Sequence, residues 1–157
     1  MNMGDKVDDF SLPGTDGEFT LSAVRGKTVV LYFYPKDDTP GCTIESGEFS
    51  ALLDDFTAAD AVVLGVSRDS IRAHNKFRGK FNYAHHLLAD EEEKVCGQFG
   101  VMGNKTMFGK PARGIIRSTF IIDSAGRLGR EWRGIKEAAG HAAEVLAVVR
   151  QMTKSCG

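Results

Sequence analysis

The chain has 157 residues with a formal net charge of −1, and 42% of its residues are hydrophobic. A domain of this size buries roughly 70% of its unfolded surface, so folding requires neither a disulfide framework nor a structural metal. The nearly balanced charge excludes a general electrostatic attraction to nucleic acid or to a membrane surface. We expect one domain over residues 1–157, with a mobile tail from about residue 151.

The cysteine content and the first residues of the chain indicate a reducing compartment. There are three cysteines, an odd number that does not suit a disulfide framework. The polar segment 1–10 lacks the apolar core of a signal peptide, and no apolar stretch is long enough to cross a membrane. We therefore expect a cytoplasmic protein whose thiols are reduced.

Hydrophobic periodicity predicts strands that alternate with helices along most of the chain. In chain order the predicted elements are a hairpin (10–21), a strand (28–34), a helix with Phe49, Leu52, Leu53 and Phe56 on one face, a strand (61–67), a helix capped by Ser70 (70–81), a short strand (86–90), a short helix ended by glycine (91–100), a strand (115–123), its antiparallel partner (127–134) and a closing helix (141–152). This order predicts an α/β fold with a mostly parallel central sheet flanked by helices, and its closing ββα unit is that of a thioredoxin-like core.

The segment Thr39-Pro40-Gly41-Cys42 predicts a cysteine in the first turn of a helix, directly after a buried strand. Thr39 is a good N-cap residue and Pro40 is favoured at the first helical position, so Cys42 falls at the third. Unpaired backbone N–H groups and the positive end of the helix dipole favour a thiolate at that place. Gly41 leaves the backbone open to a small substrate. The pattern indicates a reactive thiolate, although a free cysteine can also be buried and inert.

Cys42 lacks the companions that disulfide exchange or hydrolysis requires. Thr39 and Glu45 occupy the positions three residues before and after it, so no C-x-x-C motif is present. None of the four histidines lies in a context that brings it beside Cys42 as a general base. A thiolate with a hydroxyl, backbone donors and an arginine can instead attack a peroxide oxygen and become a sulfenic acid.

The segment "YPKDDTPGCTIE" resembles the active-site segment of the peroxiredoxins, with Pro35, Thr39 and Cys42 in their P-x-x-x-T-x-x-C pattern. Together with "VCGQFGVMGNKTMFGK" and "GIIRSTFIID", it is most similar to the bacterioferritin comigratory protein branch, also called PrxQ. The resemblance runs from about residue 4 to residue 150 and implies a thioredoxin fold with an N-terminal β-hairpin extension. It further implies thiol-dependent reduction of hydrogen peroxide and organic hydroperoxides by a monomer, with no metal or organic cofactor.

Position by position, the resemblance also implies a role for each site residue. Cys42 would be the peroxidatic nucleophile, and Thr39 would orient the peroxide. Arg117 would stabilise the thiolate and the transition state, while Pro35 would shield the pocket from water and Glu45 would hold the arginine. Two of these residues have simpler explanations: Arg117 could face outward from a surface strand, and Glu45 could stabilise the helix dipole.

The cysteine that usually resolves the sulfenic acid is missing. Many members of the branch carry it five residues after the nucleophile, where this chain has Gly47, and others carry it on the following helix. The remaining candidates are Cys96, which lies in an apolar turn typical of a core, and Cys156, which could reach Cys42 of its own or of a second chain. An external thiol from thioredoxin, glutaredoxin or glutathione is the third possibility.

We therefore expect an enzyme, a thiol peroxidase that cycles with a thiol donor and binds neither nucleic acid nor membranes. The alternative is a peroxide-sensing redox switch that uses the same oxidation of Cys42 but stops at a stable oxidised form. A non-catalytic thioredoxin-fold module would instead carry an unreactive Cys42.

Overall fold

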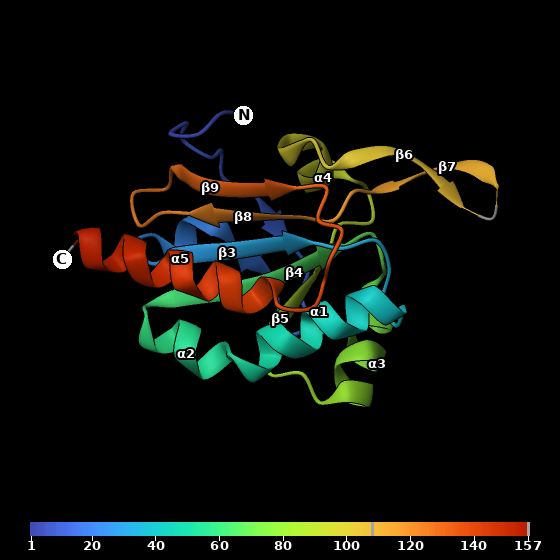
Figure 1. Ribbon diagram of the computed structural model, residues 1–157, viewed down its shortest axis with the longest axis horizontal. Coiled ribbons are helices and arrows are strands. Elements are labelled where there is room, and N and C mark those ends of the chain that lie inside the picture. Colours follow the sequence, from blue (N-terminus) through green and yellow to red (C-terminus); the bar gives the residue numbers. More distant parts are fainter. Residues whose placement is uncertain (108, 157) are drawn as a thin grey trace.

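A five-stranded sheet forms the centre of the protein in the computed structural model, which describes residues 1–107 and 109–156, without the side chains of residues 105–107 and 154–156. The strand order is β5 (His86–Ala89), β4 (Ala61–Ser67), β3 (Thr28–Phe33), β8 (Ser118–Ile122) and β9 (Leu128–Arg133). β3 pairs in parallel with β4, and β4 pairs in parallel with β5, whereas β8 is antiparallel to both β3 and β9. Within this sheet β8 alone runs against the other strands, which agrees with the mostly parallel sheet that we predicted (Figure 1).

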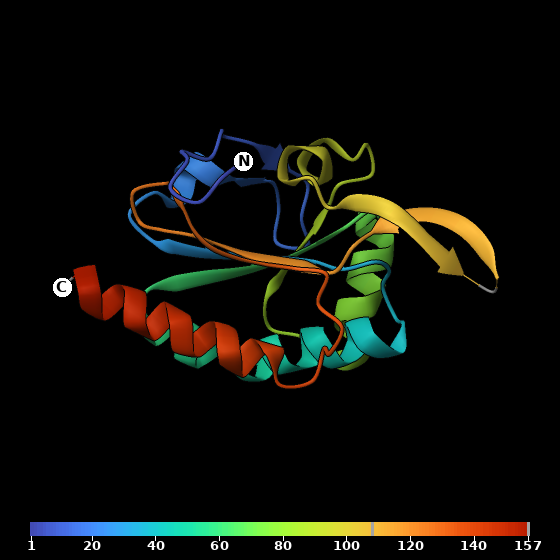
Figure 2. The same cartoon turned by 45° about the horizontal axis from the view of Figure 1, so that its top comes forward.

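Helices and a hairpin cover the two faces of the sheet (Figure 2). One face carries α1 (Pro40–Ala51), α2 (Leu53–Ala58), α3 (Ile71–Phe81) and α5 (His141–Cys156). The other carries the hairpin of β1 (Ser11–Leu12) and β2 (Phe19–Thr20), the short 3-10 helix η1 (Leu21–Val24) and α4 (Lys94–Phe99). The predicted N-terminal hairpin and the flanking helices are confirmed.

Strand β3 contributes side chains to both layers of the core, because successive side chains point to opposite faces of the sheet. Leu31 and Phe33 join the cluster under α4, whereas Val30 and Tyr32 join the cluster under the helices of the other face. Tyr32 stacks on Phe49 of α1 with ring centroids 4.4 Å apart, so the first helix is packed directly against the central strand. All six residues of β3 are buried, as its uninterrupted apolar run predicted.

The helix predicted through residues 49–56 is divided in two. α1 ends at Ala51, Leu52 leaves helical geometry with φ −98° and ψ 5°, and α2 begins at Leu53. Phe49 and Phe56 are fully buried as their spacing predicted, and the two leucines between them are half-buried.

Two features near residue 110 were not predicted. A hairpin of β6 (Met102–Met107) and β7 (Lys110–Ile115) projects from the body of the protein (Figure 1). Its sequence lacks alternating apolar residues, and Pro111 disfavours a strand, so the usual signals are absent. The strand predicted over 115–123 was also wrong in its first part, because β7 ends at Ile115 and β8 begins only at Ser118.

Arg117 therefore lies in a link between two strands and not inside a buried strand. The backbone of this link bonds outside the sheet ladder: the Ile116 N–H donates to the Val101 carbonyl, and the Arg117 carbonyl accepts from the Ile135 N–H. The link turns the chain from the hairpin into β8, and it leaves the arginine side chain free to point toward α1.

Two further helix boundaries follow the predicted signals, whereas α4 begins at Lys94 and not at the predicted residue 91. The Ser70 hydroxyl accepts a hydrogen bond from the Ala73 N–H, and α4 ends at Phe99, directly before Gly100, whose φ is +65°. α5 continues to Cys156, so the mobility expected from about residue 151 stays a prediction. Among the described residues, no helix is long and apolar enough to span a membrane.

We expect Ser70→Ala to lower the free energy of unfolding by about 1 kcal/mol, because it removes the hydroxyl cap of α3. Urea unfolding measures the change. Ser70→Asp is the matched control, since aspartate also caps and should keep most of the stability. Equal losses in the two variants would contradict a capping role for this side chain.

Candidate active site

Cys42 stands at the third position of α1, where the sequence placed it. Thr39 precedes the helix in an extended conformation with φ −102° and ψ 154°, and Pro40 begins it. The Thr39 carbonyl accepts the first helical hydrogen bond from the Thr43 N–H, at 2.8 Å. The Thr39 hydroxyl does not cap the helix and instead donates to the Lys36 carbonyl at 2.8 Å. Because the hydroxyl hydrogen is used in this bond, the Thr39 oxygen is available as an acceptor.

Arg117 joins Cys42 to Glu45. Its Nη2 lies 3.3 Å from the Cys42 Sγ, and its Nη1 donates to Glu45 Oε1 at 2.6 Å. The three side chains are nearly enclosed, with exposed fractions of 1% for Cys42, 0% for Glu45 and 14% for Arg117. Because Cys42 and Glu45 are three residues apart in a helix, they face the same side and one guanidinium can reach both.

The pairing of β3 with β8 brings the arginine to this place. Ser118, the first residue of β8, is directly opposite Phe33, the last residue of β3. Arg117 precedes Ser118 and therefore lies beside the end of β3, from which the chain continues into α1. Strand register accordingly places a cation beside a cysteine that is 75 residues away in the sequence.

The charges of this group depend on one another. Burial raises the pKa of Glu45 to about 7, although the neighbouring Arg117 acts in the opposite direction. Burial acts to lower the pKa of Arg117, but the charges of Glu45 and Cys42 outweigh it and raise that pKa. The guanidinium therefore stays charged, and its positive charge favours the thiolate form of the sulfur it contacts.

Gly41 makes room for the guanidinium. A Cβ atom at this position would lie 2.9 Å from Arg117 Nη2, which is too close for the arginine to stay where it is. The sequence indicated Gly41 as an opening for substrate, and the structure adds this second reason for a glycine. A Cβ at Gly47 of the same helix would instead lie at an ordinary contact distance, 3.8 Å from the Tyr83 ring.

Further polar contacts hold α1 in place. The Tyr32 hydroxyl is hydrogen-bonded to Ser46 Oγ at 2.9 Å and to His85 Nε2 at 2.5 Å, and the Tyr83 hydroxyl donates to the Thr43 carbonyl at 3.0 Å. Burial lowers the pKa of His85 to about 3, so its ring is neutral and adds no charge near the site. Sequence reasoning missed these residues, because a tyrosine in a strand and a lone histidine carry no signal of a shared contact.

The other two cysteines lie away from Cys42. Cys96 is fully buried in α4, in the core layer on the opposite face of the sheet from Cys42. Burial, together with the contact to Asp90, raises the pKa of its thiol. α5 carries Cys156 to the end of the molecule opposite the start of α1 (Figure 1), and its side chain lies outside the described residues. Cys96 is therefore not placed to meet Cys42 within the folded chain.

Pro35 is half-buried and follows the last residues of β3, and its shielding role stays a prediction. In the part of the chain that the structure describes, no three His, Cys, Asp or Glu side chains are grouped as a metal site requires.

We expect Gly41→Ala to slow alkylation of Cys42 by iodoacetamide at pH 7 about tenfold or more, since a lost charge-assisted hydrogen bond is worth about 1.5–3 kcal/mol. Peptide mass mapping separates Cys42 from the other cysteines. Gly47→Ala is the matched control on the same helix and should leave the rate unchanged. Equal rates for the two variants would show that the Arg117 contact does not activate the sulfur.

We also expect Glu45→Gln to change how stability depends on pH. The folded pKa of Glu45 is about 7 against an ordinary 4.5, so its contribution is most favourable below pH 4.5 and is lost as the pH rises through 7. The variant lacks this loss, which is on the order of 1–3 kcal/mol. Urea unfolding of both proteins between pH 4.5 and 8 should show the variant gaining relative stability across that window. A difference in the free energy of unfolding that stays constant with pH would show that Glu45 does not titrate in this window.

Comparisons with known proteins agree along nearly the whole chain. Residues 3–130 match the AhpC/TSA family. Peroxiredoxin Bcp of Bacillus subtilis is 46% identical over 155 residues, which cover 98% of each chain. A structure of Xanthomonas campestris bacterioferritin comigratory protein, described in terms of its alkyl peroxide reduction activity, is 43% identical and superposes with a TM-score of 0.86 over 92% of each chain. A structure of a Xylella fastidiosa PrxQ mutant superposes with a TM-score of 0.91 at 39% identity over 97% of each chain.

Proposed function

The chain belongs to the AhpC/TSA family as a peroxiredoxin, a thiol-dependent peroxidase with a thioredoxin fold, and we propose that Cys42 is its peroxidatic nucleophile. The observation that carries this assignment is the guanidinium of Arg117, which lies 3.3 Å from the Cys42 sulfur and is held by Glu45. A cation at this place favours the thiolate and can stabilise the negative charge that leaves with the second peroxide oxygen.

The proposed reaction assigns one task to each residue. The Cys42 thiolate attacks the terminal oxygen of a hydroperoxide, a sulfur–oxygen bond forms, and the O–O bond breaks. The sulfur is oxidised to a sulfenic acid, and the departing alkoxide or hydroxide takes a proton to give an alcohol or water. Arg117 stabilises the departing oxygen. The Thr39 hydroxyl donates its hydrogen bond to the Lys36 carbonyl. Its oxygen accepts a hydrogen bond from the peroxide and orients it.

We further propose a cycle with one cysteine in this chain and an external thiol. Position 47 is glycine, Cys96 lies across the sheet and Cys156 lies on a helix that ends at the far side of the molecule. A donor thiol attacks the sulfenic acid and releases water, and a second thiol then restores the Cys42 thiolate and leaves a donor disulfide. Thioredoxin, glutaredoxin or glutathione would serve as the donor in a reducing cytoplasm.

The substrates we propose are hydrogen peroxide and organic hydroperoxides, and the active form is a monomer. The alkyl peroxide reduction activity of the Xanthomonas campestris protein supports the alkyl class. The sensor alternative rests on the absent cysteine at position 47, since an oxidised Cys42 without an internal partner could persist. Turnover separates the two, because an enzyme cycles with a thiol donor and a sensor stops after one equivalent of peroxide.

Treatment with one equivalent of hydrogen peroxide and dimedone, without reductant, should leave a dimedone adduct on Cys42 alone. Intact mass and peptide mapping identify the adduct. We expect Cys42→Ser to abolish peroxide consumption, while a Cys96→Ser/Cys156→Ser double variant should keep both the adduct and turnover with a thiol donor. A disulfide from Cys42 to either of the other cysteines would replace the one-cysteine cycle with an internal resolving step.

A further inference from the structure

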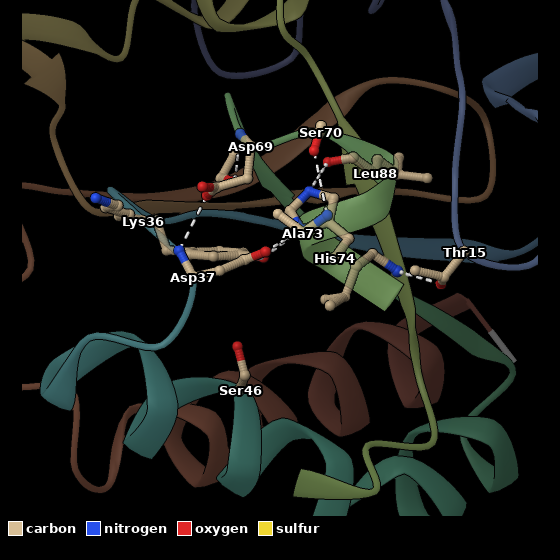
Figure 3. A network of polar contacts seen from close by, with 12 residues as sticks. Thr15, Lys36, Asp37, Ser46, Asp69, Ser70, Ala73, His74 and Leu88 are labelled. Atoms are coloured by element: carbon tan, nitrogen blue, oxygen red, sulfur yellow. Dashed lines mark hydrogen bonds and ion pairs between the residues drawn. The ribbon is translucent and has the colours of Figure 1, made fainter. Parts of the chain in front are cut away.

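A buried polar network holds the loop between β3 and α1, which contains Thr39 (Figure 3). The carboxylate of Asp37, in this loop, accepts a hydrogen bond from the Tyr34 hydroxyl at 2.6 Å and lies 2.7 Å from His74 Nδ1. His74 belongs to α3 and is completely buried, as is Tyr34. The network thus attaches the loop to a neighbouring helix through side chains that are buried or nearly so.

Both ring nitrogens of His74 lie close to oxygen atoms. Its Nε2 lies 2.8 Å from the Leu88 carbonyl of β5, which can only accept. Its Nδ1 faces the Asp37 carboxylate, which also accepts. His74 is therefore held between Asp37 and β5 through both of its ring nitrogens.

The backbone of Asp37 is fixed as well. Its N–H donates to Asp69 Oδ2 at 2.9 Å, and the same oxygen accepts from the Ser67 hydroxyl at 2.6 Å. Asp69 and Ser67 lie at the end of β4, so the loop is bound to β4 through its main chain and to α3 and β5 through its side chain. This double attachment leaves Asp37 little freedom to move.

Asp38 converts this attachment into a constraint on Thr39. Its φ is +59°, a left-handed conformation that costs a non-glycine residue of order 1 kcal/mol and persists only where the surroundings hold it. Asp37 holds the chain on one side of Asp38, and the start of α1 holds it on the other. If the Asp37 anchor were released, Asp38 could relax and Thr39 would move.

We propose that Asp37 and His74 are positioning residues, which place the Thr39 hydroxyl for its contact with peroxide. This inference rests on the proposed function and deepens it. The pair acts through the loop backbone and touches neither the sulfur nor Arg117 in the structure's hydrogen bonds. The pair therefore affects the rate of the reaction with peroxide, which depends on geometry. It does not affect the charge of Cys42, on which Arg117 acts.

A purely stabilising role is the competing explanation. Burying the polar side chains of an aspartate and a histidine costs desolvation energy that their contact often fails to recover, so stability alone is a weak reason for such a pair. The two roles differ in what they change. A loosened or unfolded loop alters every reaction of Cys42, whereas a misplaced Thr39 alters only the reaction with peroxide.

The test compares two rate constants of Cys42 in the full chain: oxidation by hydrogen peroxide in a single turnover, and alkylation by iodoacetamide. We expect Asp37→Ala and His74→Ala to slow oxidation by about tenfold or more, since small misplacements of a reacting group cost this much, and to change alkylation little. Asp37→Asn should keep both rates, because its amide can donate to a neutral His74 and its oxygen can accept from Tyr34.

Two controls make the result specific. His141→Ala removes another buried histidine, hydrogen-bonded to Thr119, and should change neither rate. The double variant Asp37→Ala/Thr39→Val should react with peroxide no more slowly than Thr39→Val alone, because the aspartate acts through that threonine. If Asp37→Ala does not fold, Tyr34→Phe removes one bond to the aspartate and should give the same split between rates with a smaller amplitude.

Parallel losses of both rates, or additive losses in the double variant, would overturn the positioning role and leave a structural one. Unchanged oxidation in Asp37→Ala and His74→Ala would overturn it too. A wild-type Cys42 that does not react with hydrogen peroxide would instead refute the proposed function itself, and the positioning role would fall with it.

Discussion

The contact of one guanidinium with a carboxylate and a sulfur is the constraint on which the site depends. A charge that is almost wholly enclosed must be paired, and Arg117 meets that need with Glu45 while it contacts Cys42. Both partners lie on one face of α1, and the arginine arrives from the link before β8. The site therefore exists only when the antiparallel pair β3–β8 and the helix that follows β3 are both formed. Fold and reactivity are joined at this single contact.

Uncharged contacts hold α1 against the sheet. Contacts that involve charged side chains hold the Cys42 sulfur and the loop between β3 and α1. Ser46, Tyr32 and His85 fix α1 to the sheet without adding charge, because burial keeps the histidine neutral. The local field at Cys42 then comes chiefly from Arg117 and from the first turn of its helix. Because different residues perform these two tasks, the reactivity of the Cys42 sulfur can change without weakening the packing of α1.

Sequence patterns predicted the alternating elements and the place of Cys42 in α1, and the resemblance to the peroxiredoxins implied that Thr39, Glu45 and Arg117 belong to one site. Local rules were enough for the first two, because capping residues and apolar runs act over a few positions. The hairpin β6–β7 escaped prediction since its sequence has no alternating pattern, and it is stabilised by pairing between its own strands. The Asp37–His74 pair also could not be predicted, because it spans 37 positions and depends on how α3 packs.

The projecting hairpin has a further consequence for how this architecture can vary. Arg117 is located by the register of Ser118 against Phe33 and by the backbone bonds at Ile116, all of them at the base of the projection. The pairing of Ser118 with Phe33 and the backbone bond of Ile116 to Val101 lie outside the described part of the hairpin beyond the pair Met102–Ile115. Insertions or deletions there would change the outline of the molecule near its reactive end while the arginine kept its place. The β6–β7 hairpin, which can vary in length, is thus separate in the fold from the residues that perform the chemistry.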